Sequence, residues 1–383
     1  MKYNLYRFDE VAINYDKKRI PLSAMERTKR QGAFRYFGAQ GVIDYVDDYI
    51  FDGKYLLIAE DGENLKSKRQ NIAQIVEGKF WVNNHAHIVQ CNDKCILEYL
   101  AYLINGKDVS GYITGSAQPK LSQANLNAME FDIPSIKEQQ DILSILLPIE
   151  QKIRINKEIN NNLEQQTQAI FKSWFVDFEL NYGNMPSDWK VSQLGTIAKI
   201  STEVFSPAKN QNVEVEHYSI PAYDEKRYPV FETSNGIKSN KYRLSSNSVM
   251  ISKLNPDTKR IWRPYCISDN PICSTEFIVF EPINPLNRDF IYSIIDSIGF
   301  SAFLCSHTTG STNSRQRATP SVTLTYDVIV PDEKTIQAFC SIVSPMYDTI
   351  ENNIKENQKL AETRDKLLPK LMSGELDVSD IEL

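Results

Sequence analysis

Two long stretches of the chain share one rhythm of apolar and polar positions. In each, a seam residue returns alternately after three and four positions, which is the spacing at which two α-helices pack along a common line. The pattern predicts two long helices that pack on each other as an antiparallel coiled coil within one chain. The seam positions are Ile153, Asn156, Asn160 and Leu163 in the first stretch, and Ile350, Asn353, Asn357 and Leu360 in the second.

The two stretches correspond residue by residue at a constant offset of 197 positions, so that Ile133-Pro134 matches Val330-Pro331. Asparagines stand at the same two seam positions of both copies. A buried asparagine lowers stability but disfavours slipped registers, because a shifted amide loses its partner. The alternative is that each helix packs on its own globular part and the asparagines face water. Such a repeat predicts one structural unit, a globular segment followed by a long helix, present twice.

The helix boundaries carry local signals. Ser135 and Glu138 have the spacing of a capping box, so a helix should begin just after Pro134. Asp332 can cap the second helix in the same way. Pro148 and its counterpart Pro345 should each end a short first helix or open the long one, because proline cannot donate the backbone hydrogen bond of a helix interior.

The segments that precede the helices have strand-like patterns. Short apolar and β-branched runs such as Tyr55–Ala59 and Ala86–Val89 are separated by turn formers, and Ser248–Ile251 and Glu276–Phe280 are the corresponding runs of the second segment. The two segments also start alike, around Phe8 and Leu194. The predicted fold class is α+β: two globular mixed α/β domains joined by the two packed helices, with an internal pseudo-twofold repeat. The predicted boundaries are 1–134, 135–180, 181–331 and 332–383.

Composition narrows the class of protein. A chain of 383 residues with 42% apolar and 24% charged residues suits two or more globular domains. We expect a cytoplasmic protein with reduced cysteines and no membrane association, since no apolar run is long enough to span a bilayer and no signal-peptide core begins the chain. Cys91 and Cys95 lie near His85 and His87, but their spacing is not that of a standard zinc site.

The net charge of −6 is concentrated in the helical regions. Residues 136–185 carry a net charge of −2 and residues 332–383 carry −5, whereas residues 1–135 and 186–331 carry 0 and +1. The acidic helices therefore suit protein docking better than contact with phosphates. The nearly neutral globular segments contain local basic clusters, which can bind phosphates or simply face solvent.

Several motifs, in order and in duplicate, resemble the DNA specificity subunit of type I restriction–modification systems. They are Thr114-Gly115-Ser116-Ala117-Gln118-Pro119-Lys120, Ile133-Pro134 and Glu138-Gln139-Gln140 in the first copy, and Thr309-Gly310-Ser311, Val330-Pro331 and Leu367-Leu368-Pro369-Lys370-Leu371 in the second. The resemblance covers essentially the whole chain. The second copy departs from the first by two extra residues between its Gly-Ser and Val-Pro, which puts the match of Gln316 to Gln118 in doubt.

The resemblance implies two target recognition domains that read a split target in double-stranded DNA. It implies that the conserved helices dock methylation subunits, two of them, and that restriction/translocase subunits join the complex. S-adenosylmethionine, ATP and Mg²⁺ would belong to those partners, and this chain would hold no cofactor and carry no catalysis.

Candidate DNA-binding residues follow from the chemistry of base reading. Arg and Lys contact guanine or phosphate, and Asn and Gln contact adenine, while phosphate contacts outnumber base contacts. The Gly-Ser loops could present backbone N–H groups to phosphate or be ordinary turns. The candidates in the first segment are Arg27, Lys29, Arg30, Arg35, Lys68, Arg69, Gly115, Ser116, Gln118 and Lys120; those in the second are Lys238, Lys241, Arg243, Lys253, Lys259, Arg260, Arg263, Gly310, Ser311, Arg315 and Arg317.

Catalytic motifs are weak. The chain has no phosphate-cradling G-x-x-x-x-G-K-[ST] loop and no G-x-G-x-x-G pattern. Asp61, Glu77 and Lys79 loosely mimic a nuclease site, so a metal-dependent nuclease is one alternative function. A coiled-coil scaffold without a DNA role is another.

Overall fold

The structure of the protein is a computed structural model that describes residues 2–67, 70–115, 118–309 and 316–378. The chain divides into two compact units, residues 1–150 with 363–383 and residues 151–362. The domain boundaries expected from the sequence stay predictions. Each compact unit combines one globular part with segments of both long helices, so a helix is shared by two units rather than forming a region of its own.

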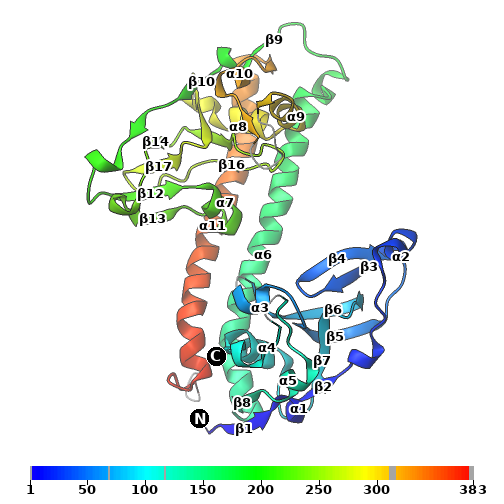
Figure 1. The fold of residues 1–383 in the computed structure, drawn as a ribbon. Coiled ribbons are helices and arrows are strands. Elements are labelled where there is room, and N and C mark those ends of the chain that lie inside the picture. Colours follow the sequence, from blue (N-terminus) through cyan, green and yellow to red (C-terminus); the bar gives the residue numbers. More distant parts are fainter. Residues whose placement is uncertain (1, 68–69, 116–117, 310–315, 379–383) are drawn as a thin grey trace. The chain divides into compact units, whose positions relative to one another are not determined.

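The two long helices are α6 (Ile136–Phe175) and α11 (Glu333–Met372) (Figure 1). The capping box before α6 is confirmed: the Ser135 N–H donates to Glu138 at 2.9 Å, and the Glu138 N–H donates to Ser135 Oγ at 3.4 Å. The Asp332 carboxylate accepts from the Thr335 N–H at 3.1 Å at the start of α11. Both helices therefore begin where the sequence signals predicted.

The predicted break at the two prolines is wrong. Pro148 lies inside α6 and Pro345 inside α11, and both helices continue through them. A proline inside a helix costs about 3 kcal/mol because one hydrogen bond is lost. Near Pro148 the buried side chains of Leu143 and Leu146 belong to the core of the first unit. Burial of such side chains, at about 1.5–3 kcal/mol each, is enough to offset that loss.

Within the second unit the helices pair in antiparallel order along the predicted seam. The Asn156 Nδ2 donates to Asn357 Oδ1 at 2.9 Å, and the Asn353 Nδ2 donates to Asn160 Oδ1 at 2.8 Å. Asn156 is fully buried and Asn160 is 7% exposed, so these two amides do not face water. The intramolecular coiled coil is confirmed, and each asparagine of one copy meets the other asparagine of the second copy.

The globular part of the first unit is built on a six-stranded sheet with strand order β2-β7-β5-β6-β3-β4 (Figure 1). Its strands alternate with short helices and turns. The elements are β1 (Asn4–Arg7), α1 (Phe8–Val11), β2 (Ala12–Asn14), η1 (Asp16–Lys18), α2 (Ala24–Lys29), β3 (Gln31–Gly38), β4 (Gly41–Val46), β5 (Phe51–Ala59), α3 (Asn64–Ser67), β6 (Ala73–Val82), β7 (Ala86–Cys91), α4 (Leu97–Gly106), η2 (Ser110–Tyr112), α5 (Gln123–Asn127) and β8 (Glu130–Ile133).

The globular part of the second unit contains a four-stranded sheet, β10-β18-β15-β16, and a five-stranded sheet, β11-β14-β17-β12-β13. The elements are η3 (Glu179–Asn181), β9 (Lys190–Gln193), η4 (Leu194–Thr196), β10 (Ala198–Ser201), β11 (Val204–Phe205), η5 (Pro207–Lys209), β12 (Glu214–Tyr218), α7 (Ile220–Lys226), β13 (Val230–Thr233), η6 (Ser234–Gly236), β14 (Lys241–Arg243), β15 (Val249–Ser252), β16 (Ile261–Trp262), β17 (Pro271–Ser274), β18 (Phe277–Pro282), η7 (Pro285–Asn287), α8 (Arg288–Asp296), α9 (Ile298–Ser306), β19 (Thr308–Thr309), β20 (Arg317–Ala318), α10 (Pro320–Thr323) and β21 (Asp327–Val330).

Each globular part shares its hydrophobic core with the long helices. In the first unit Ile142 and Leu146 of α6 join Leu371 of α11 in one buried cluster with the strands. In the second unit Phe175 and Phe339 do the same, with their ring centroids 5.1 Å apart. Neither globular part is therefore complete without segments from both repeats of the chain.

Candidate nucleic-acid interface

Thr114 and Gly115 of the first unit lie at the start of a tight hairpin. Thr114 and Lys120 exchange two backbone hydrogen bonds of 2.8 Å, and the hairpin is fixed to the segment after β5, where the Gly62 N–H donates to the Pro119 carbonyl at 3.2 Å. Gly115 has a φ of +84°, and a Cβ there would lie 2.3 Å from the Gln118 carbonyl oxygen. The glycine is required for this turn, because both the backbone conformation and the close approach exclude a larger residue.

The second unit repeats this arrangement. Thr309 pairs with Arg317 across β19 and β20, and the Asn255 N–H donates to the Gln316 carbonyl at 2.9 Å. Leu121 in the first unit and Ala318 in the second donate their N–H groups in the same way, to Glu60 at 2.7 Å and to Lys253 at 2.9 Å. Both hairpins are therefore fixed to the segment that follows the equivalent strand, β5 or β15.

This common anchoring makes Lys120 and Arg317 equivalent residues. They are 197 positions apart, like the seam residues, and both form isolated bridges to the anchoring segment, with Asp61 and Leu254. Pro119 rather than Gln118 corresponds to Gln316, so the two extra residues of the second copy fall within its hairpin. The sequence comparison started from the Gly-Ser pair and missed this match. Counting back from the helices at the constant offset would have found it.

Each of these basic side chains is paired with a carboxylate from a different position. Lys120 Nζ lies 3.1 Å from Glu60, and Arg317 Nε lies 3.1 Å from Glu276. Lys120 and Arg317 keep 54% and 48% of their side chains exposed. Lys253, a further candidate, is half-buried beside the second hairpin. The cations face solvent more than their carboxylates do, since Glu60 and Glu276 are 12% and 31% exposed, so Lys120 and Arg317 can contact a phosphate from the solvent side.

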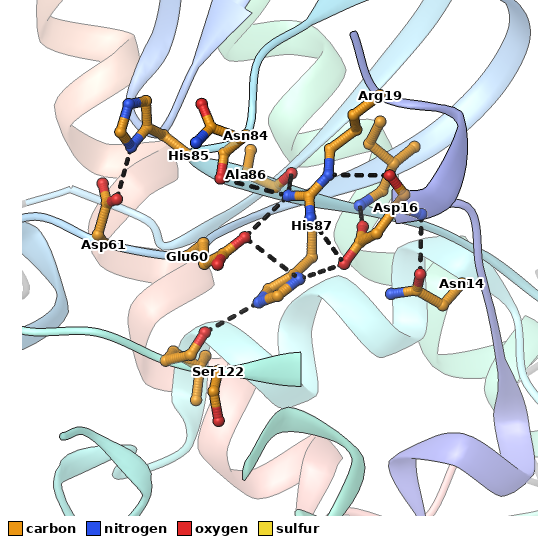
Figure 2. A network of polar contacts seen from close by, with 12 residues as sticks. Asn14, Asp16, Arg19, Glu60, Asp61, Asn84, His85, Ala86, His87 and Ser122 are labelled. Carbon is orange, nitrogen blue, oxygen red and sulfur yellow. Dashed lines mark hydrogen bonds and ion pairs between the residues drawn. The ribbon is translucent and has the colours of Figure 1, made fainter. Parts of the chain in front are cut away.

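A buried charged cluster links β7 to the segment that follows the first hairpin (Figure 2). His87 is 1% exposed, with Nδ1 at 2.6 Å from Asp16 and Nε2 at 2.9 Å from the Leu121 carbonyl. Since both ring nitrogens face acceptors, the ring makes both bonds only as a positively charged imidazolium. Arg19 bridges this cluster to Glu60 with a contact of 2.8 Å. Sequence reasoning missed the cluster, because Asp16, Glu60 and His87 have no motif spacing.

Burial and partners act in opposite directions on the two carboxylates of this cluster. Burial alone would raise the pKa of Asp16, but hydrogen bonds from His87 and from the Ile88 N–H hold that pKa below its ordinary value. Burial also works against ionisation of Glu60, whose pKa is nevertheless lowered by Arg19, His87 and Lys120. The charged groups of the cluster are therefore paired with one another. Through His87, the cluster also links β7 to Leu121, directly after the hairpin.

The basic candidates near α2 and β3 are mostly engaged. Arg27 and Arg30 each pair with a carboxylate at 2.9 Å, from Asp44 and Asp47. Arg35 donates to the Glu77 carbonyl at 2.5 Å, and Lys29 is exposed. The structure thus brings these four basic residues onto adjoining elements of the first unit, whereas Lys68, Arg69 and Ser116 lie outside the described residues.

The basic candidates of the five-stranded sheet have different surroundings. Lys238 is exposed, while Lys241 is 7% exposed and its Nζ donates to the Ser239 carbonyl at 3.0 Å and to its Oγ at 2.8 Å. Burial lowers the pKa of Lys241. Arg243 stacks over Phe205, with its guanidinium carbon 4.9 Å from the ring centroid. Gly310, Ser311 and Arg315 lie outside the described residues.

Three further candidates are ion-paired on other elements, and one of them is buried. Arg263 is 8% exposed and contacts Asp289 at 2.8 Å, Asp348 at 2.7 Å and Glu351 at 3.0 Å. This buried network attaches the globular part to α11, and its burial leaves Arg263 unable to contact DNA. Arg260 contacts Asp224 with two bonds, at 2.6 and 2.9 Å, and Lys259 pairs with Asp296 at 2.5 Å.

The alternative catalytic site is not assembled. Glu77 lies opposite Lys54 in the register of β5 and β6, whereas Asp61 follows the far end of β5. At about 3.3 Å per residue, these carboxylates are roughly 20 Å apart along the strand. Asp61 instead contacts His85 at 2.5 Å, and Lys79 stacks over Tyr49. The nuclease alternative therefore lacks a common site for Asp61, Glu77 and Lys79.

The described residues contain neither a metal-binding group nor a single helix that could span a membrane. There, no group of three His, Cys, Asp or Glu side chains is arranged to hold a metal ion. Cys91 and Cys95 are free thiols. No single described helix is long and apolar enough to cross a bilayer, and α8 (with η7) and α9 reach that length and composition only together, across a 63° bend.

The comparisons with known proteins agree with the duplicated frame. The family model described as the type I restriction modification DNA specificity domain matches residues 2–165. The type I restriction enzyme MjaIX specificity subunit of Methanocaldococcus jannaschii is 28% identical over 323 residues, which cover 76% of this chain and 71% of that protein. The chain is therefore similar to the specificity subunits of type I restriction–modification systems, and its residues 2–165 match their DNA specificity domain.

Two further comparisons agree with this similarity. A putative type I restriction enzyme specificity subunit of Haemophilus influenzae is 33% identical over 138 residues, 36% of this chain and 35% of that protein. The crystal structure of a type I restriction-modification S subunit from M. genitalium matches with a TM-score of 0.64 at 14% identity, covering 97% of this chain and 96% of that one. The fold of the whole chain is thus that of a specificity subunit. Members of this family are non-catalytic DNA-recognition subunits.

Proposed function

We propose that this chain is a specificity subunit that reads a split DNA target, with one globular part for each half-site. The observation that carries the proposal is the equivalence of Lys120 and Arg317 on two equally anchored hairpins, 197 residues apart, in globular parts that differ outside this shared frame. A duplicated frame that carries different surfaces suits two different half-sites. Phosphate contacts from the frame would set the position on DNA, and the differing parts would read bases.

The paired helices would set the distance between the half-sites. Residues 149–175 alone extend for about 40 Å at about 1.5 Å per residue. That length corresponds to about one turn of B-DNA, the usual spacing between two reading elements on one face. The asparagine pairs support this role, because a fixed register is what a spacing element needs.

The same helices would dock methylation subunits, two of them as the repeat suggests, with restriction/translocase subunits completing the complex. Ile155 and Ile159 support this, since they lie one turn apart on α6, outside the seam, and are 37% and 41% exposed. S-adenosylmethionine, ATP and Mg²⁺ would be bound by those partners and not by this chain, in the cytoplasm.

The decisive experiment is methylome sequencing of a host that carries this chain with its methylation subunits. We expect one split adenine-methylation motif with a spacer of fixed length. A continuous motif would reject the proposal of two half-sites. Sequence-independent binding by the purified complex would favour the scaffold alternative.

Docking is tested separately by co-purification of the methylation subunits with the full chain. We expect Ile155→Ser with Ile159→Ser to abolish co-purification, because the substitution removes apolar area from the contact. Lys157→Ala with Asn161→Ala, on exposed positions of the same helix turns, is the matched control. Equal recovery of partners with both variants would place the docking surface elsewhere.

A further inference from the structure

The five-stranded sheet of the second unit carries a polar recess of about 340 Å³. It lies between η5 and η6, next to the start of β14. Among its lining residues are Gln211, Asn235, Lys238, Ser239 and Asn240, and none of the lining residues is acidic. Its volume is at the lower end of the range for ligand sites, enough for the edge of a base or for one phosphate group.

Part of the rim is fixed by hydrogen bonds. The Asn235 Nδ2 donates to Asn212 Oδ1 at 2.6 Å, and the Asn212 N–H donates to Asn235 Oδ1 at 2.9 Å. Asn212 has a φ of +60°, which this reciprocal pair holds in the left-handed region. The buried Lys241 ammonium is satisfied by Ser239, just below the rim. The walls of the recess are therefore ordered before any ligand arrives.

Other rim groups keep their hydrogen-bonding capacity. Within the described part of the chain, the amides of Gln211 and Asn240 have no hydrogen-bond partner, and Lys238 has no ion pair; all three side chains are exposed. An amide presents one donor and one acceptor side by side, which is the pattern that reads N6 and N7 of adenine. An exposed lysine without a carboxylate partner suits a phosphate. Two amides beside one cation thus match DNA better than a simple anion, because an anion would accept from the amide N–H groups but leave their carbonyl oxygens without a donor.

The place of the recess in the fold supports the same ligand. The strand order β10-β18-β15-β16 repeats the order β2-β7-β5-β6 of the first unit, with all neighbours antiparallel in both. The five-stranded sheet lies outside this shared frame, where the first unit instead has β3 and β4. A surface that belongs to one half only is where half-site specificity can reside.

We infer that this recess is a DNA-reading site of the second half, in which Gln211 and Asn240 contact base edges and Lys238 contacts a phosphate. The inference rests on the proposed function, because it requires that the second half read its own half-site. It assigns base reading to a sheet of the second unit and not to the shared hairpin.

The test compares methylomes of hosts that express the full complex. With Gln211→Ala and Asn240→Ala together, we expect the half-site read by the second unit to lose one or more specified bases while the other half-site is unchanged. In binding to duplexes of the wild-type motif, discrimination at those bases should fall roughly 10- to 100-fold. Lys238→Gln should instead weaken binding to all duplexes and reduce the salt slope by about 1.

The matched control is Gln193→Ala with Lys199→Ala, on exposed positions of β9 and β10 in the same unit, which should leave the motif intact. Should the double variant fail to assemble, Asn240→Ala alone gives the same readout with a smaller change. If the wild type shows a split motif and the Gln211→Ala/Asn240→Ala and Asn240→Ala variants both retain it in full, the inference is overturned and the proposed function stands. A wild-type complex with no split motif overturns the proposed function, and the inference with it.

Discussion

The two halves of the molecule keep the same frame and differ in what is added to it. In both, a ribbon of two strands leads into the long helix: β1 pairs with β8, and β9 pairs with β21. In both, a hairpin ends on an exposed cation. The first half extends the shared sheet with β3 and β4, whereas the second half builds a separate sheet. The repeated elements are thus the two-strand ribbon, which connects the globular part to the long helix, and the hairpin.

The two halves also bury their charges in different places. In the first half the charged cluster around His87 links β7 to the segment that follows the hairpin. His87 pairs with Ile58 across β5 and β7, and the equivalent pair in the second half is Ile278 with Ile251. Ile278, at the position of His87, is apolar and 2% exposed. A buried charged network lies instead around Arg263, between the globular part and α11. We therefore expect loss of charge to loosen the reading surface in the first half and the attachment to α11 in the second.

The largest effect is expected for Arg263→Ala. It leaves Asp289, which is 4% exposed, without its main partner, and breaking a buried pair in this way costs about 3–5 kcal/mol. Hydrogen exchange of the full chain should show faster exchange in α8 and β16, with β5 and β7 unchanged. Arg243→Ala is the control, since Arg243 lies 3.7 Å from Glu203 at a partly exposed site and should cost less than about 1 kcal/mol. Equal loss in both units would contradict the division of roles.

The next effect is expected for Asp16→Asn. The variant removes the charge that pairs with His87, at a cost of about 1.5–3 kcal/mol for a buried bond to a charged group. The pKa of Asp16 is held below its ordinary value, so its contribution to stability is present above about pH 4 and is lost as pH falls through the lower folded pKa. Hydrogen exchange of β7 as a function of pH should show this acid-dependent loss in the wild type but not in the variant. A retained acid-dependent loss in the variant would mean that Asp16 does not supply it.

The sequence predicted most of the frame and little of the charge arrangement. Helix ends, seam and strands depend on local patterns, so Ser135 and the asparagine positions could be found from spacing alone. The break at Pro148 was predicted wrongly, because core packing against Leu143 and Leu146 overrides a local rule. The partners of Arg263 come from α8 and α11, far away in the sequence, and no spacing identifies them. The sequence therefore could not distinguish Arg263, which is buried and ion-paired, from Lys238, which is exposed.

The asparagine seam joins the two copies, and its coupling is expected to be smaller. The Asn160–Asn353 pair should contribute about 0.5–1.5 kcal/mol, as a hydrogen bond between neutral groups does. A double-mutant cycle with Asn160→Ala and Asn353→Ala would measure this coupling free energy from unfolding of the second unit. Additive effects of the two substitutions would show that the amides do not interact. Glu158→Ala with Arg154→Ala, an exposed pair on α6, is the control and should show a smaller coupling.

The smallest effect on stability is expected for Lys120→Gln and Arg317→Gln. Both cations are about half-exposed, and Glu60 keeps its contact with Arg19, so each substitution should change the free energy of unfolding by about 1 kcal/mol or less. If both residues contact phosphate, each should weaken binding of the assembled complex to its target and lower the salt slope by about 1, without altering the motif. The two variants should act alike, because the hairpins are equivalent, in contrast to Gln211→Ala with Asn240→Ala in the polar recess, which should alter one half-site. If the salt slope falls for only one of the two variants, only that hairpin contacts DNA, although both hairpins are anchored in the same way.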